Sequence, residues 1–278
     1  MKKRLFSTLL CCLLLSATAF ASCGKTENDG ETGGGVTYTK NENGTAYTVT
    51  GFVKSGDTVT IDAEYEGLPV TKIAKGAFNA KTTDSEEVKE VVIPKSVTEI
   101  ENGACNGCTK LEKVHYTGTA TEWLAIKMYE SDATEGGNEN PFVASANKAE
   151  LYANGEKVTS VTYTTNGRVG VQLKGCASLA SVTVADTATK IGAYAFAGCK
   201  NLTAVVIGTG VNYIGVGAFD NCNKLASVEF KDTQGWGYET TGATNLAQIP
   251  PTLIGDKTGI VEYILDEAYR GIWTKTNA

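Results

Sequence analysis

Residues 191–230, IGAYAFAGCKNLTAVVIGTGVNYIGVGAFDNCNKLASVEF, decide the fold because their second half repeats the first. The unit reads I-x-x-x-A-F-x-x-C-x-x-L-x-x-V-x-φ, in which φ is an apolar or aromatic residue, and it recurs after 23 positions. A fixed period of this length is the sequence signature of stacked repeats. Five registers agree at the period: Ile191 and Ile214; Phe196 and Phe219; Cys176, Cys199 and Cys222; Leu179, Leu202 and Leu225; Val182, Val205 and Val228.

Each unit predicts two short strands joined by a helical turn. In L-x-x-V-x-φ the valine and φ alternate with a polar position, which is typical of a half-buried strand. The segment A-F-x-x-C-x-x-L places its apolar residues on one face of a short helical turn. A second short strand follows, as at residues 97–100 and 211–214. Because one unit cannot bury its own apolar face, the sequence predicts an α/β solenoid of stacked units with short parallel strands.

Further copies extend the pattern, and together they resemble a known family. Residues 100–116 carry a copy with Cys105 in the phenylalanine register, residues 73–78 a partial copy, and residues 168–184 a degenerate one. These registers resemble the BspA-like leucine-rich repeats of bacterial surface proteins over most of residues 36–276. The resemblance implies a leucine-rich-repeat solenoid and adhesion to host proteins, to other cells or to matrix components.

The insertion at 117–157 breaks the period. Thr119 to Glu122 is a capping-box candidate, so a short helix should carry Trp123 and Ile126. A loop is expected at 135–140, and Asn154-Gly155 predicts a hairpin between 151–152 and 158–161. From Cys108 to Cys176 is 68 residues, one short of three periods. This spacing favours one continuous but distorted stack over two blocks that meet at a bend.

Caps are expected at both ends of the stack, because solenoids need covered ends. The N-terminal cap should be a hairpin around Asn43-Gly44. The C-terminal cap should be a helix with one apolar face, formed by Ile260, Val261, Ile264, Leu265, Ala268 and Tyr269. We predict a signal peptide at 1–22, a lipid-anchored flexible tether at 23–35, the N-terminal cap and repeats at 36–116, the insertion at 117–157, C-terminal repeats at 158–232, and an irregular connection with the helical cap at 233–278.

The N-terminus indicates export. Three basic residues precede an apolar core at 9–15 that is too short to span a bilayer. Two cleavage sites compete: ordinary signal peptidase would cut after Ala21 and leave a secreted protein, whereas Phe20-Ala21-Ser22-Cys23 resembles a lipobox, in which Cys23 is diacylated. The polar, glycine-rich run at 24–35 suits a tether. We therefore expect a cell-surface lipoprotein whose only membrane contact is the acyl anchor.

The cysteine pair Cys105-x-x-Cys108 suggests a redox dithiol or half a zinc site when it is considered alone. Cys108, however, shares the register of the other repeat cysteines, and Cys105 replaces an inward phenylalanine. We interpret both as core residues, because a buried free cysteine behaves as a small hydrophobe. Disulfides between stacked cysteines stay open, since adjacent strands lie about 5 Å apart.

No catalytic, cofactor or metal site is expected. The chain has one histidine, His115, which argues against histidine-based metal centres and against Ser-His-Asp or Cys-His nucleophiles. The glycine-rich turns lack a phosphate-loop continuation, and the carboxylates show no calcium-loop spacing. A formal net charge of −6 disfavours nucleic acid as a partner.

The regular strand surface is what remains as a candidate site. The outward positions of L-x-x-V-x-φ should line one extended face that binds extracellular proteins or glycans of a host, a matrix or other cells. These positions are Glu90, Val92, Lys113, His115, Ser181, Thr183, Ala204, Val206, Ser227 and Glu229. The alternative is capture of glycans or peptides as nutrients, for which exposed aromatic residues should cluster among Trp123, Tyr129, Tyr152 and Trp236.

Overall fold

The computed structural model describes residues 35–53, 56–79, 85–128, 140–146, 148–164, 166–239, 246–266, 269 and 271–276. The predicted signal peptide and Cys23 lie outside these residues and stay predictions. All described residues belong to the unit Gly33–Ala278. Within the described ranges, no helix combines the length and the apolar composition needed to cross a membrane.

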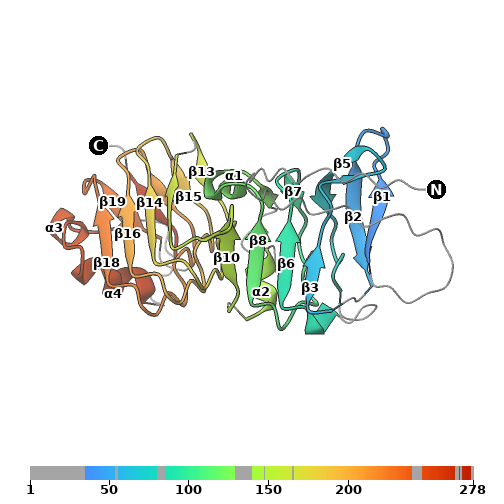
Figure 1. Cartoon of the computed structure of the whole chain (residues 1–278). Helices are drawn as coiled ribbons and strands as arrows, with labels where there is room; N and C mark the ends of the chain where they lie inside the picture. Colours follow the sequence, from blue (N-terminus) through green and yellow to red (C-terminus); the bar gives the residue numbers. More distant parts are fainter. Residues whose placement is uncertain are drawn as a thin grey trace, which may run out of the picture. The chain divides into compact units, whose positions relative to one another are not determined.

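One side of the unit carries two sheets of mostly parallel strands (Figure 1). The first sheet has the order β11-β10-β8-β6-β3, and the second has the order β12-β14-β16-β18. The strands of the first are β3 (Thr58–Thr60), β6 (Glu90–Ile93), β8 (Lys113–Tyr116), β10 (Glu150–Ala153) and β11 (Glu156–Lys157). Those of the second are β12 (Ser160–Tyr163), β14 (Ser181–Val184), β16 (Ala204–Ile207) and β18 (Ser227–Phe230).

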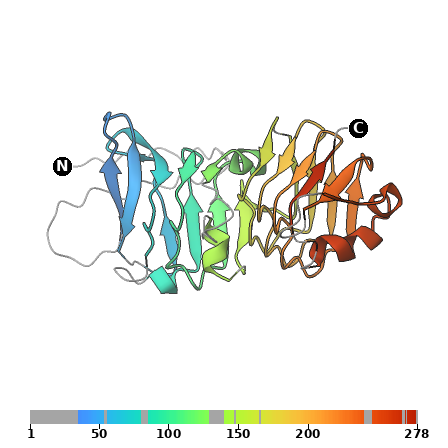
Figure 2. The same ribbon diagram turned by 180° about the vertical axis from the view of Figure 1, so that it is seen from behind.

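Two further sheets contain the remaining strands, and Figure 2 gives the view from behind. The first has the order β1-β2-β5-β7-β9, and β4 also pairs with β5; the second has the order β13-β15-β17-β21-β19-β20. The strands are β1 (Val36–Lys40), β2 (Tyr47–Phe52), β4 (Glu64–Tyr65), β5 (Leu68–Ile73), β7 (Glu99–Ile100), β9 (Lys127–Met128), β13 (Arg168–Val169), β15 (Lys190–Ile191), β17 (Tyr213–Ile214), β19 (Trp236–Tyr238), β20 (Ala247–Gln248) and β21 (Trp273–Lys275).

The described helices are short. They are the 3₁₀-helix η1 (Ser85–Glu87) and the α-helices α1 (Ala120–Leu124), α2 (Pro141–Ala144), α3 (Pro251–Ile254) and α4 (Gly259–Leu265). The strands up to β11 form what we call the N-terminal block, and those from β12 onward form the C-terminal block.

The 23-residue period is the step between neighbouring parallel strands. Val182 pairs with Val205, and Val205 pairs with Val228, so each valine register becomes a buried ladder. The predicted solenoid is therefore confirmed. The predicted turns are present but are not α-helical: Ala197 N–H donates to Tyr194 O and Cys199 N–H donates to Phe196 O, which makes a series of four-residue turns. Left-handed residues such as Tyr194 (φ 56°) and Gly198 (φ 76°) prevent an α-helix there.

The repeat cysteines lie in the core as free thiols. All five described cysteines are buried and unbridged. The Sγ–H of Cys199 donates to Leu173 O at 3.0 Å, and that of Cys222 donates to Phe196 O at 3.1 Å, so each reaches the turn before it. Burial raises the pKa of the Cys199 thiol well above its ordinary value and that of Cys222 to about 12. Because the thiolate is the reactive species, these thiols are inert at neutral pH.

The insertion follows its sequence signals only in part. Thr119 caps α1 through the predicted capping box. Asn154 (φ 50°) and Gly155 (φ 81°) form the turn of the β10–β11 hairpin, as a type I′ turn requires. The returning strand, however, is Glu156–Lys157 instead of 158–161. Most of the loop expected at 135–140 lies outside the described residues.

The two blocks share a core but not their sheets. One cluster of buried apolar residues runs from Tyr47 to Trp273. By contrast, β11 and β12 are sheet edges that do not pair with each other, and the opposite sheets end at β9 and β13. The buried core is therefore continuous, as a single stack requires, whereas the hydrogen-bonded strand pairing is interrupted at the insertion.

Each end of the unit carries antiparallel structure. The hairpin of β1 and β2 surrounds Asn43-Gly44, where the sequence places one. At the other end β21 pairs antiparallel with β17, and α4 buries Ile260, Val261 and Ile264. Leu265 is 36% exposed, so it departs from the predicted apolar face.

Candidate functional site

All ten predicted face residues lie in two rows that run across the parallel strands. Their side chains are half-buried, whereas the residues between them are buried, giving the same alternation in β6, β8, β14, β16 and β18. We call the two rows the strand face. In the N-terminal block the first row is Thr58, Glu90, Lys113 and Glu150, and the second is Thr60, Val92, His115 and Tyr152. In the C-terminal block the first row is Ser160, Ser181, Ala204 and Ser227, and the second is Thr162, Thr183, Val206 and Glu229.

The N-terminal block presents a charged strand face in which carboxylates and cations are paired. Glu90 accepts a hydrogen bond from Lys113 Nζ at 2.6 Å and lies 3.4 Å from His115 Nε2. The hydrogen bond from Lys113 lowers the pKa of Glu90. Glu150 forms an equivalent pair with Lys157. The charges of this half are therefore largely compensated within the face.

His115 packs against the insertion. Its ring stacks on that of Tyr152, with the centroids 5.0 Å apart, because β10 lies beside β8 in register. The sequence places His115 outward, and the structure agrees. Among the described residues, no group of three or more His, Cys, Asp and Glu side chains is arranged to hold a metal ion.

The C-terminal block presents a strand face of small neutral side chains. Ser181, Thr183, Ala204 and Val206 occupy its centre. The charge at its end is paired, since Lys257 Nζ donates to Glu229 at 2.8 Å. Small side chains on adjacent parallel strands leave this half open to close approach by another surface.

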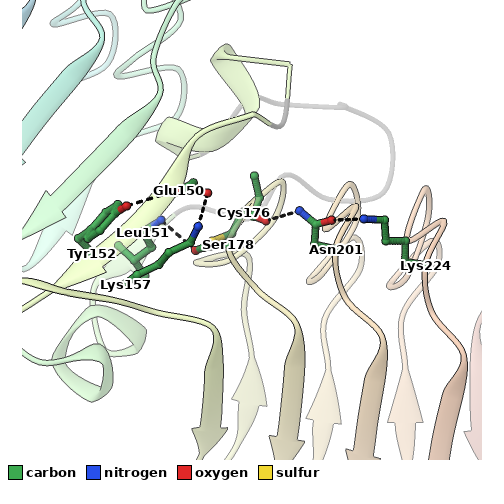
Figure 3. Close-up of polar contacts among 9 residues, drawn as sticks. Glu150, Leu151, Tyr152, Lys157, Cys176, Ser178, Asn201 and Lys224 are labelled. Carbon is green, nitrogen blue, oxygen red and sulfur yellow. Dashed lines mark hydrogen bonds and ion pairs between the residues drawn. The ribbon is translucent and has the colours of Figure 1, made fainter.

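Polar contacts join the blocks where the sheet pairing stops (Figure 3). The Leu151 N–H donates to Ser178 Oγ at 3.0 Å, and Ser178 Oγ lies 3.3 Å from Cys176 Sγ. Farther along, Asn201 Nδ2 donates to Ala177 O and Lys224 Nζ donates to Asn201 Oδ1. The Leu151 N–H thus donates to the hydroxyl of Ser178 instead of to a carbonyl oxygen of a neighbouring strand.

The rows contain six residues beyond the ten predicted ones: Thr58, Thr60, Glu150, Tyr152, Ser160 and Thr162. Of these, the sequence singled out only Tyr152, as an aromatic residue, and it also missed Lys157, the partner of Glu150. Glu150, Tyr152 and Lys157 lie on the β10–β11 hairpin, which the 23-residue period does not cover. The alternation of buried and exposed positions around the Asn154-Gly155 turn was the signal that could have found them, because it sets the direction of each side chain.

The aromatic cluster expected for nutrient capture is not supported by the described residues. Trp123 is 0% exposed and Trp236 is 1% exposed, so both belong to the core. Each directs its indole N–H to a main-chain oxygen, of Gln172 and Asp232 respectively. Tyr129 lies outside the described residues. Of the three that the structure describes, only Tyr152 lies on the strand face.

The chain is similar to a known repeat family and to solved bacterial structures. The model of the family "BspA type Leucine rich repeat region" matches six copies, at residues 59–131 and 171–249. No curated protein matches. The fold is similar to the crystal structure of a leucine rich cell surface protein from Faecalibacterium prausnitzii A2-165, with a TM-score of 0.52 and 22% identity over 82% of this chain and 62% of that one.

A second solved structure is the T. pallidum leucine rich repeat protein, with a TM-score of 0.36 and 22% identity over 73% of this chain and 71% of that one. The chain spans less than two thirds of the length of the F. prausnitzii protein. The family model, in turn, covers more than half of the 278 residues. This chain therefore belongs to the BspA-type leucine-rich repeat family.

Proposed function

We propose that this protein is a non-enzymatic surface lipoprotein that binds extracellular macromolecules through its strand face. The observation that carries the proposal is the pair of side-chain rows that crosses the parallel strands within each block. A long regular face of this kind suits contact with a protein or a glycan chain better than the enclosure of a small molecule. Membership of a repeat family with bacterial surface proteins supports the same role.

The chemistry of the face supports recognition by shape and hydrogen bonding. Lys113 and Lys157 are already paired with carboxylates, so little uncompensated charge is left to attract a partner. The hydroxyls of Ser181 and Thr183, by contrast, can donate and accept hydrogen bonds. We infer an adhesive contact with a matrix, host or neighbouring-cell component.

We expect an arginine at the centre of the neutral half to abolish such binding. Thr183→Arg places a long cation on a strand position flanked by Thr162 and Val206, whereas Thr209→Arg places the same group on an exposed turn that belongs to neither row. The acyl-free Cys23→Ala chain is presented to immobilised matrix proteins and mucins. Thr183→Arg should weaken capture at least about tenfold, as expected when a bulky charge meets a packed interface, and Thr209→Arg should not.

Two results of this assay would contradict the proposal. One is the absence of any partner tighter than about millimolar, where the free energy of binding is only around −4 kcal/mol. The other is a partner that both arginine variants bind as well as the parent does, which would place the contact elsewhere on the molecule.

The anchor is a separate part of the proposal. Acylation of Cys23 would hold the folded unit at the cell surface through a tether of 12 residues, whose r.m.s. span is roughly 20 Å. Palmitate labelling of the exported protein is expected for the parent chain and not for Cys23→Ala. An unlabelled parent chain would refute the anchor and favour secretion after cleavage at Ala21.

A further inference from the structure

A polar cleft lies on the strand side where the two blocks meet. Its volume is about 440 Å³, which is within the roughly 300–1,000 Å³ range of ligand-binding clefts. One wall is the β10–β11 hairpin, with Asn154, Glu156 and Lys157, and the other begins at Ser160 of β12. Thr119 and Ala120, at the start of α1, complete the lining.

Main-chain groups from both walls point into this cleft. Thr159 O accepts from Ser181 N–H and Tyr163 O accepts from Ala185 N–H, so the odd residues of β12 bond to β14. Because main-chain groups alternate in direction along a strand, the N–H and C=O of Ser160 point the opposite way. On the hairpin, Val158 N–H donates to Leu151 O, which by the same alternation turns the main chain of Lys157 away from β10.

The exposure of β12 agrees with an open edge. Ser160 and Thr162 are exposed, whereas the corresponding residues of β14 and β16 are half-buried. No described strand pairs with β12 on the side facing the hairpin. An open strand edge offers donors and acceptors in the spacing that another extended chain presents.

The two charged residues that line the cleft, Glu156 and Lys157, differ in whether they are paired. Lys157 is paired with Glu150, as Figure 3 shows. Glu156 is exposed and has no cationic partner among the described residues. The uncompensated charge at the cleft is therefore a single carboxylate. It is complementary to a lysine or arginine side chain.

We propose that this cleft binds a short extended peptide segment of the partner, which pairs through its main chain with Ser160 and places a basic side chain on Glu156. The lining favours a peptide over a sugar, because none of the described residues that form it is aromatic, so it offers no flat ring on which a sugar could stack. The inference rests on the proposed function, because the cleft lies between the two halves of the strand face. It specifies which part of the partner this cleft would recognise.

The test uses a synthetic probe and a matched pair of variants. The probe is an end-blocked, dye-labelled pentapeptide of sequence Thr-Lys-Thr-Val-Thr, whose binding to the full Cys23→Ala chain is followed by fluorescence anisotropy. Ser160→Pro removes the N–H that faces the cleft and leaves the bonds to β14 in place, because proline is tolerated on an open strand edge. Ser160→Ala keeps that N–H and removes only the hydroxyl.

Saturable binding is expected, with a loss of at least about tenfold for Ser160→Pro, which removes a main-chain hydrogen bond, and for Glu156→Lys, which removes a charge-assisted contact. Ser160→Ala should bind like the parent chain. Circular dichroism serves to check that Ser160→Pro is folded. A peptide N-methylated at alternate residues should fail to bind the parent chain and every variant. Equal binding of the N-methylated peptide, or no binding of the parent peptide alongside saturable binding of chitotriose, would overturn the proposal.

The outcome is separable from that of the strand face. A partner that Thr183→Arg releases but Ser160→Pro retains, together with no peptide binding, would refute the cleft and leave the proposed function standing. Peptide binding without any matrix or mucin partner would support the cleft and refute the proposed adhesive function.

Discussion

Replacing Trp123 by alanine is expected to lower the free energy of unfolding by about 3–5 kcal/mol, the usual cost of truncating a fully buried tryptophan. The ring contacts Tyr116 of β8 and Phe142 of α2 edge to face, with centroid distances of 5.5 and 5.8 Å. Its Nε1–H donates to Gln172 O at 3.0 Å. One side chain thus joins the N-terminal block, the insertion and the first turn of the C-terminal block.

The conservative variant separates packing from hydrogen bonding. Trp123→Phe keeps an aromatic ring between Tyr116 and Phe142 but leaves the Gln172 oxygen without its donor, which should cost about 1–3 kcal/mol. Urea unfolding followed by circular dichroism measures both. Because each repeat is stabilised by its neighbours, the alanine variant is also expected to unfold in two steps. A single transition with a loss below about 1 kcal/mol would show that Trp123 does not couple the blocks.

The repeats could be predicted because one sequence period corresponds to one turn of the solenoid. Residues that are 23 positions apart occupy equivalent sites on adjacent turns, so the registers of Val182, Val205 and Val228 specify the strand pairing directly. The local shape of the turns was less accessible. The A-F-x-x-C-x-x-L pattern fits one helical face, but Tyr194 and Gly198 adopt left-handed conformations and donate their N–H groups to Val216 O and Asp220 O of the next turn.

The sequence was sufficient to predict where the candidate site lies, but not which side chains interact with one another in it. Alternation along each strand is enough to place Lys113 and His115 outward. Their partners come from other strands: Glu90 from the preceding turn and Tyr152 from the insertion. The insertion has no repeat to calibrate it, so its periodicity could not show that Trp123 is buried or that the returning hairpin strand is only two residues long.

The insertion replaces repeat-to-repeat hydrogen bonds with side-chain ones, and Asn140 is the clearest case. Its Nδ2 donates to Val171 O at 2.6 Å and to Lys174 O at 2.8 Å. Its Oδ1 accepts from the N–H groups of Phe142 and Val143 and so caps α2. The residue is 3% exposed. The amide therefore meets donors with its oxygen and acceptors with its nitrogen, an arrangement that only an amide side chain satisfies.

Asn140→Asp is accordingly expected to destabilise the protein by about 3–5 kcal/mol at neutral pH, as for a buried charge without a partner. One carboxylate oxygen still accepts from the N–H groups of Phe142 and Val143, but the other oxygen faces the carbonyl oxygens of Val171 and Lys174 without a donor. Burial and these two oxygens favour the protonated acid, so its pKa in the folded state should lie above the unfolded value.

The sign of the pH dependence follows from that raised pKa. The folded variant binds more protons than the unfolded chain between the two pKa values, so its stability falls as the pH rises through this window and is recovered on acidification. The difference in unfolding free energy between Asn140→Asp and the parent should therefore shrink from pH 7 towards about pH 4. Asn140→Ala, which loses the same bonds without adding a charge, should show a pH-independent loss of about 2–4 kcal/mol. If the aspartate variant lost no more stability at pH 7 than at pH 4, the amide of Asn140 would not be the donor that joins the insertion to the C-terminal block.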